Sequence, residues 1–69
     1  MTYIVLEIQT ASDGTTAALK DQYSLFNDAL NKYYTVLAAA AKSAMAKHAA
    51  VLMDDTGETI KKECIHHKS

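Results

Sequence analysis

One cysteine and three histidines are the residues of this chain whose types best suit a zinc site or a thiol nucleophile. Cys64 and His66 stand close together in the stretch ECIHH, and His48 precedes the apolar run AAVLM. Thiolate and imidazole are ligands that zinc prefers, and three of them with an open fourth position are chemically acceptable. Whether His48, Cys64 and His66 meet depends on how the strands that carry them pair.

The pairing of these strands is set by the turn DDTG, and two registers are possible. A three-residue loop pairs His48 with Cys64 and projects both of them, together with His66, from one face of the sheet. A two-residue loop pairs Ala49 with Cys64 instead and moves His48 to the opposite face, because side chains alternate along a strand. The candidate zinc site exists in the first register only.

We expect neither a metal centre nor a nucleophilic pair of Cys64 and His48. The C-x-H spacing lacks the second ligand pair that makes zinc motifs specific, and nothing in the sequence supplies an oxyanion hole. Cys64 is expected to pack under a helix as a small apolar residue, and His66 and His67 are expected at a loosely held chain end. No cofactor is predicted, and the chain is not expected to be an enzyme.

The length and charge of the chain narrow the classes of function further. Its 69 residues are expected to form a single domain, 1–69. A domain of this size buries only about 60% of its unfolded surface and often needs a disulfide, a metal or self-association, and one cysteine excludes an internal disulfide. All seven basic residues are lysines and the net charge is -1, which disfavours nucleic-acid binding. No apolar stretch approaches the ~20 residues of a membrane span, and the lone cysteine and the lack of a signal sequence predict a cytoplasmic protein.

The first hairpin is predicted from YIVLEIQT and the DG pair that follows it. Its first strand covers 3–10, and the face toward the core is expected to hold Ile4, Leu6 and Ile8. A two-residue loop at Asp13-Gly14 would place Glu7 beside Lys20 on the other face. Asp21 would then point toward the core, and we expect the second strand to bulge there.

A helix and a second hairpin complete the predicted fold. Residues 25–44 carry apolar side chains at three- and four-residue steps after a potential N-cap at Ser24, which predicts one amphipathic helix. Strands near 47–54 and 58–66 flank the DDTG turn, whose aspartates are expected to make turn contacts. The predicted fold class is α+β with the order ββαββ, an antiparallel sheet of two hairpins with the helix packed on one face.

One face of this sheet is expected to remain uncovered. The run AAVLM is apolar at consecutive positions, so both faces of its strand should lie against something, whereas one helix covers only one face. The uncovered face is expected to be an apolar interaction patch consisting of Tyr3, Val5, Val51, Met53 and Ile65. We therefore expect a non-enzymatic protein-protein interaction module that forms a homodimer or other homo-oligomer, or binds another protein partner, through this face. The alternative is a metal- or thiol-dependent protein that uses His48, Cys64 and His66.

Several segments spread over nearly the whole chain also form a recognisable set. They are YIVLEIQT, DGT, KY at 32–33, VLAAAA at 36–41 and EC at 63–64. In these segments the chain resembles a family of small uncharacterised bacterial proteins from gut Gram-positive genomes, often near phage or conjugative elements. It departs from the family pattern at Tyr34, where histidine is expected, and at Ala46, where proline is frequent. The resemblance implies a bacterial, mobile-element source and brings no known activity or site residue.

Overall fold

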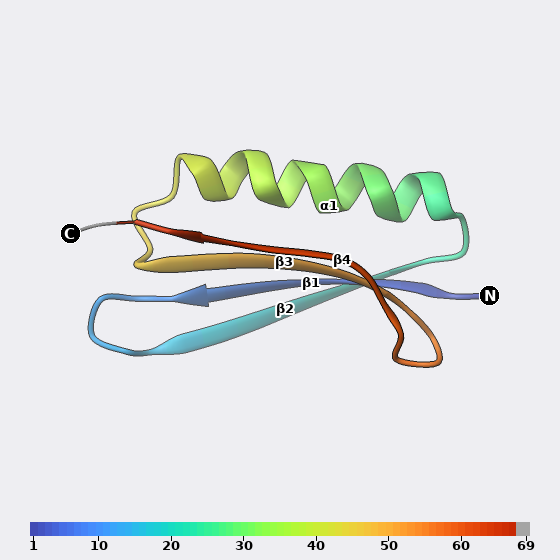
Figure 1. Cartoon of the computed structure of the whole chain (residues 1–69), viewed down its shortest axis with the longest axis horizontal. Coiled ribbons are helices and arrows are strands. Elements are labelled where there is room, and N and C mark those ends of the chain that lie inside the picture. The colour runs from blue at the N-terminus through green and yellow to red at the C-terminus, as the bar shows by residue number, and fades with distance from the viewer. Residues whose placement is uncertain (68–69) are drawn as a thin grey trace.

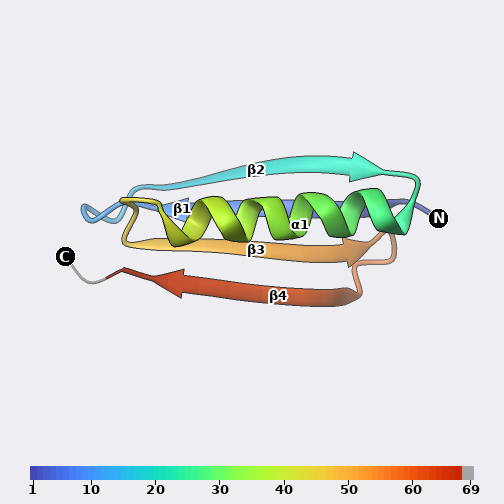
Figure 2. The same ribbon diagram turned by 90° about the horizontal axis from the view of Figure 1, so that it is seen from above.

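Two hairpins meet along their first strands and form one four-stranded antiparallel sheet. The computed structural model describes residues 1–67, and its strands are β1 (Tyr3–Thr10), β2 (Thr16–Tyr23), β3 (Lys47–Asp54) and β4 (Thr59–His66). The order across the sheet is β2-β1-β3-β4, and helix α1 (Phe26–Ala41) lies on one face above the two central strands (Figures 1 and 2). The predicted α+β fold with the order ββαββ is confirmed.

The first hairpin closes through three loop residues rather than the predicted two. The Ala11 amide donates to the Thr15 carbonyl at 2.8 Å, and the Gly14 amide donates to the Ala11 carbonyl at 3.0 Å. Gly14 has a φ of 92°, a left-handed conformation that glycine adopts without steric cost, and the Asp13 carboxylate accepts the Thr15 amide. Because Ser12 joins the loop, Glu7 lies opposite Leu19 and not opposite Lys20.

This slip of one residue exchanges the two faces of β1. The odd-numbered residues of β2 face the helix as predicted, so the shifted register turns Val5 toward the helix, where it is 1% exposed. The prediction that Ile4, Leu6 and Ile8 face the helix-covered core is therefore wrong. Tyr3 lies on the same side as Val5 and meets the ring of Phe26 edge-on, with the ring centroids 5.5 Å apart.

The core forms where one stripe of α1 meets the two central strands. Its buried residues are Val5, Ala29, Tyr33, Val36, Ala50 and Leu52. Tyr33 is 3% exposed and the adjacent Tyr34 is 51% exposed, as expected from the helical stripe. Alanines on this stripe allow α1 to approach the sheet closely.

Both ends of α1 differ from the prediction. Leu25 is the N-cap residue and makes no side-chain cap, so Ser24 does not have the predicted role. The helix ends at Ala41 rather than at 44, and the Ser43 hydroxyl accepts the Met45 amide at 3.0 Å as the chain turns toward β3. At the side of the helix, Lys32 pairs with Asp21 at 3.5 Å. β2 therefore runs without the predicted bulge, because its inward-facing carboxylate has a partner.

The second hairpin combines a three-residue loop with a β-bulge. The Asp54 amide donates to the Glu58 carbonyl at 3.0 Å, and Gly57 closes the turn with a φ of 88°. The Asp54 carboxylate accepts the amides of Thr56 at 2.9 Å and Glu58 at 3.1 Å, which confirms the predicted turn chemistry. Beyond the turn the register shifts by one residue. Met53 pairs with Thr59 and Leu52 pairs with Lys61, so Ile60 is an extra residue in β4. This bulge decides which side chains of β3 and β4 share a face.

Candidate functional site

The three candidate metal ligands lie on different faces of the sheet. His48 is 3% exposed and lies beneath α1, whereas Cys64 pairs with Ala49 and is exposed on the opposite face. His66, two residues after Cys64, shares its face. Of the two alternative loops, the three-residue loop forms, but the bulge beyond it cancels the register that would have paired His48 with Cys64. The expectation that Cys64 packs under the helix is wrong for the same reason.

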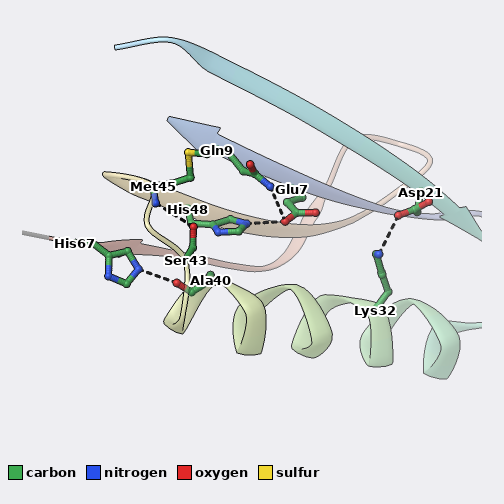
Figure 3. A network of polar contacts seen from close by, with 9 residues as sticks. All are labelled: Glu7, Gln9, Asp21, Lys32, Ala40, Ser43, Met45, His48 and His67. Carbon is green, nitrogen blue, oxygen red and sulfur yellow. Dashed lines mark hydrogen bonds and ion pairs between the residues drawn. The ribbon is translucent and has the colours of Figure 1, made fainter. Parts of the chain in front are cut away.

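A polar pair lies instead within the helix-covered side of the two central strands. His48 Nε2 lies 2.6 Å from Glu7 Oε2, and the side-chain amide of Gln9 donates to the same oxygen at 3.0 Å (Figure 3). The His48 side chain is 4% exposed and that of Glu7 is 17% exposed. An ionised carboxylate only accepts hydrogen bonds, so His48 Nε2 carries a hydrogen and is the donor in the hydrogen bond to Glu7.

The surroundings of Glu7 keep its carboxylate charged. Burial raises the pKa of Glu7, but the hydrogen bonds from His48 and Gln9 and the nearby charges of His48 and Lys32 outweigh burial and bring this pKa below its usual value of 4.5. Removing a charge from water is costly unless the charge is paired and hydrogen-bonded. The hydrogen bonds to Glu7 supply both, and they join β1 to β3.

The pair resembles the base and orienting group of a hydrolase, but its surroundings favour a structural role. His48 Nδ1 is buried and has no hydrogen-bond partner among the described residues. No pocket is found in the described part of the chain. A catalytic base must come within hydrogen-bond reach of a substrate, and the buried Nδ1 of His48 has no open approach in this conformation. The pair therefore fixes the two central strands beneath the helix.

Sequence patterns could have indicated this pair only partly. Glu7 interrupts an otherwise apolar strand, and the structure places it on the same face as Val5. His48 precedes AAVLM and shares a face with Leu52, which is 0% exposed. A carboxylate and an imidazole at such positions need partners, but only the true register of β1 against β3 shows that they are partners of each other.

The C-terminal histidines are not at a loosely held end. His66 ends β4, and the His67 amide donates to the Ala46 carbonyl at 2.9 Å. His67 Nε2 also donates to the Ala40 carbonyl at 2.7 Å, near the end of α1 (Figure 3). The Ala40 carbonyl also accepts the Ser43 amide at 3.2 Å, so His67 adds a second donor at the C-terminal end of α1.

The face of the sheet away from α1 is called the open face below. Its centre is a block of apolar side chains in three cross-strand rows of β1 and β3, namely Ile4 and Met53, Leu6 and Val51, and Ile8 and Ala49. All six are half-buried, and no element of residues 1–67 lies over them (Figure 1). Lys20 and Lys62 flank the middle row, and Lys47 lies in the row beyond Ala49, near the β1–β2 turn.

The predicted interaction patch is placed on this face only in part. Val51 and Met53 lie on the open face as expected. Tyr3 and Val5 lie on the helix-covered face, because the one-residue slip of the first hairpin turns them there. Ile65 pairs with buried His48 and is also on the helix side, because of the bulge in β4.

Comparison of the chain with models of known protein families, with curated proteins and with solved structures finds no match. Within the described residues, no helix has both the length and the apolar character needed to cross a membrane.

Proposed function

We propose that this protein is a non-enzymatic interaction module whose open face packs against the open face of a second copy. The observation that carries the proposal is the apolar block of Ile4, Met53, Leu6, Val51, Ile8 and Ala49. The two central strands turn this block away from the helix, and the described chain leaves it uncovered. Burial of apolar surface is the dominant favourable term in most protein association, so removal of this block from water drives the contact.

The open face is smaller than one side of a standard dimer interface. Strands of eight residues, at ~3.3 Å a residue, lie across the 15 Å shortest dimension of the molecule and cover about 400 Å², to which side chains and turns add. A standard interface takes ~800 Å² from each partner, so we expect a weak dimer. Two such faces packed together would form a sandwich of two sheets with the helices outside.

The edges of the sheet are less suited to association than its open face. β2 carries the adjacent charges Lys20 and Asp21, and β4 carries the run Lys61, Lys62 and Glu63. Charged side chains on edge strands are a common protection against pairing with another chain. We therefore place the contact on the face and not along β2 or β4.

The side chains of the open face also favour a protein partner over a nucleic acid. Proteins that bind single strands stack bases on aromatic rings in a positively charged groove. The paired positions of the open face carry no aromatic residue in the described chain, because Tyr3 and Tyr23 lie on the helix side and the other aromatic residues belong to α1. A cytoplasmic location in a bacterial host belongs to the same proposal, supported by the single cysteine and by the sequence resemblance.

Sedimentation equilibrium across a micromolar to millimolar range tests the proposal. Wild-type protein is expected to form dimers, and Leu6→Lys is expected to shift the equilibrium to monomers because it buries an unpaired charge in the apolar block. Leu19→Lys is the matched control, since Leu19 is 55% exposed on the helix side of β2. Wild-type protein that stays monomeric throughout, or an equal effect of both variants, would overturn the proposal.

A further inference from the structure

We infer that the two copies stack end for end, so that the β3–β4 turn of each copy lies beside Lys47 of the other. This inference rests on the proposed function and assigns the orientation of the two sheets. In an end-for-end stack, the two-fold axis lies between the sheets and perpendicular to the strands. β3 and β4 of one copy then run over β3 and β4 of the other in opposite directions.

The charges around the open face are all positive on the described strands. Lys20, Lys47 and Lys62 project from this face, and its paired strand positions in residues 1–67 carry no carboxylate. Two such faces alone would bring lysines near lysines. A stable pair therefore needs acidic groups from outside the strands, placed so that they reach the partner.

The β3–β4 turn lies where it can supply acidic groups to a partner. Figure 1 shows this turn, in orange, bending away from α1 to the open-face side at one end of the sheet. It carries Asp54, Asp55 and Glu58. The Asp54 carboxylate accepts the Thr56 and Glu58 amides and the Asp55 carboxylate accepts the Thr2 amide at 3.2 Å, whereas Glu58 is exposed beside the turn. Glu58 is therefore the carboxylate of this turn that we assign to the contact with the partner.

Lys47 lies at the other end of β3. It pairs with Thr10 of β1 and His66 of β4, and it is exposed. Rotation of the apolar block about its middle row superposes the block on itself. The same rotation carries the turn at one end of β3 over the row that holds Lys47 at the other end. Opposite charges then meet twice, once at each end of the dimer.

A side-for-side stack, with the axis along the strands, fits the charges less well. It leaves Asp55 and Glu58 of both copies at the same end, away from Lys47. Among the described residues its acidic contact to Lys47 would come from Asp13 in the β1–β2 turn, and this carboxylate accepts the Thr15 amide. The lysines of the middle row, Lys20 and Lys62, meet lysines of the partner in either stack. The contact between Glu58 and Lys47 is therefore what favours the end-for-end stack.

The test measures the dissociation constant of the dimer for a set of charge reversals. Glu58→Lys and Lys47→Glu are each expected to weaken the dimer by about five- to twentyfold, since an exposed pair contributes modestly and is present twice. The double variant Glu58→Lys with Lys47→Glu is expected to regain most of the wild-type affinity. The control of equal net charge, Glu58→Lys with Lys62→Glu, is expected to stay weak.

The outcomes separate this inference from the proposed function. A monomeric wild-type protein removes the proposed function itself. If Leu6→Lys disrupts the dimer but Lys47→Glu does not rescue Glu58→Lys, the proposed function stands. The end-for-end orientation is then overturned. Rescue of Asp13→Lys by Lys47→Glu would overturn it in favour of the side-for-side stack. Thermal unfolding of each variant checks that the fold is intact, and the charged residues that are changed are all exposed.

Discussion

Glu7 and His48, which are 41 positions apart in the chain, are joined by a 2.6 Å hydrogen bond between neighbouring strands beneath α1. Gln9 donates to the same carboxylate oxygen, so the charge of Glu7 is satisfied from both strands. On the same two strands, alternate side chains form the apolar block of the open face. The pair thus fixes the register on which both faces of the sheet depend.

Removal of the Glu7 carboxylate is expected to destabilise the fold. Glu7→Ala leaves His48 Nε2 buried without an acceptor, and an unsatisfied buried donor costs about 1–3 kcal/mol. Glu7→Gln retains an acceptor oxygen and is expected to lose less. Urea unfolding at neutral pH measures both free energies of unfolding, and equal stability of Glu7→Ala and wild type would contradict the structural role of the pair.

Acid is expected to unfold the protein in part through Glu7. The pKa of Glu7 is lowered from 4.5 and that of Asp54 from 3.8 in the folded state, so the unfolded chain binds these protons more tightly. The stability that they contribute is therefore present above these values and is lost as the pH falls through them toward the lower folded pKa values. As the pH is lowered below about 4.5, the urea concentration at the unfolding midpoint should decrease for the wild type, and it should decrease less steeply for Glu7→Gln. Identical pH profiles of the two proteins would show that Glu7 does not contribute.

Gly57 is expected to tolerate substitution only by residues that adopt a left-handed conformation. Its φ is 88°, and a Cβ atom built on it meets no atom within 4 Å, so strain in the backbone is the only penalty. Gly57→Ala is expected to cost about 1–2 kcal/mol, and Gly57→Asn less, because asparagine adopts this conformation more readily. The same urea experiment measures the difference, and equal costs for both would argue against a strained turn.

The fold was largely predictable from the sequence, whereas the face assignment was not. Periodicity and turn residues predicted the elements and their order, because these signals are local. The faces of β1 and the separation of His48 from Cys64 depend on one extra loop residue at Ser12 and one bulge in β4. Each of these irregularities moves the register by one residue and thereby exchanges two faces, and β1 and β3 are apolar enough on both faces to accept either.

A pair of leucine truncations checks the face assignment. Leu52 is 0% exposed beneath the helix, whereas Leu6 is half-buried on the open face. Leu52→Ala is expected to cost about 2–5 kcal/mol, because it leaves a cavity in the core. Leu6→Ala should cost much less in the monomer, measured at concentrations too low for association. If Leu6→Ala costs more than Leu52→Ala, Leu6 belongs to the helix-covered core and the face assignment of β1 is wrong.

The central claim is that the open face is where two copies meet, and Cys64 offers a direct reporter because it is exposed on this face. The measurement is the rate at which a maleimide modifies Cys64 as the protein concentration rises. The proposal expects the rate to fall with concentration in the wild type and to remain constant in Leu6→Lys, whose open face cannot pack. A wild-type rate that is the same at every concentration up to the millimolar range would contradict the claim.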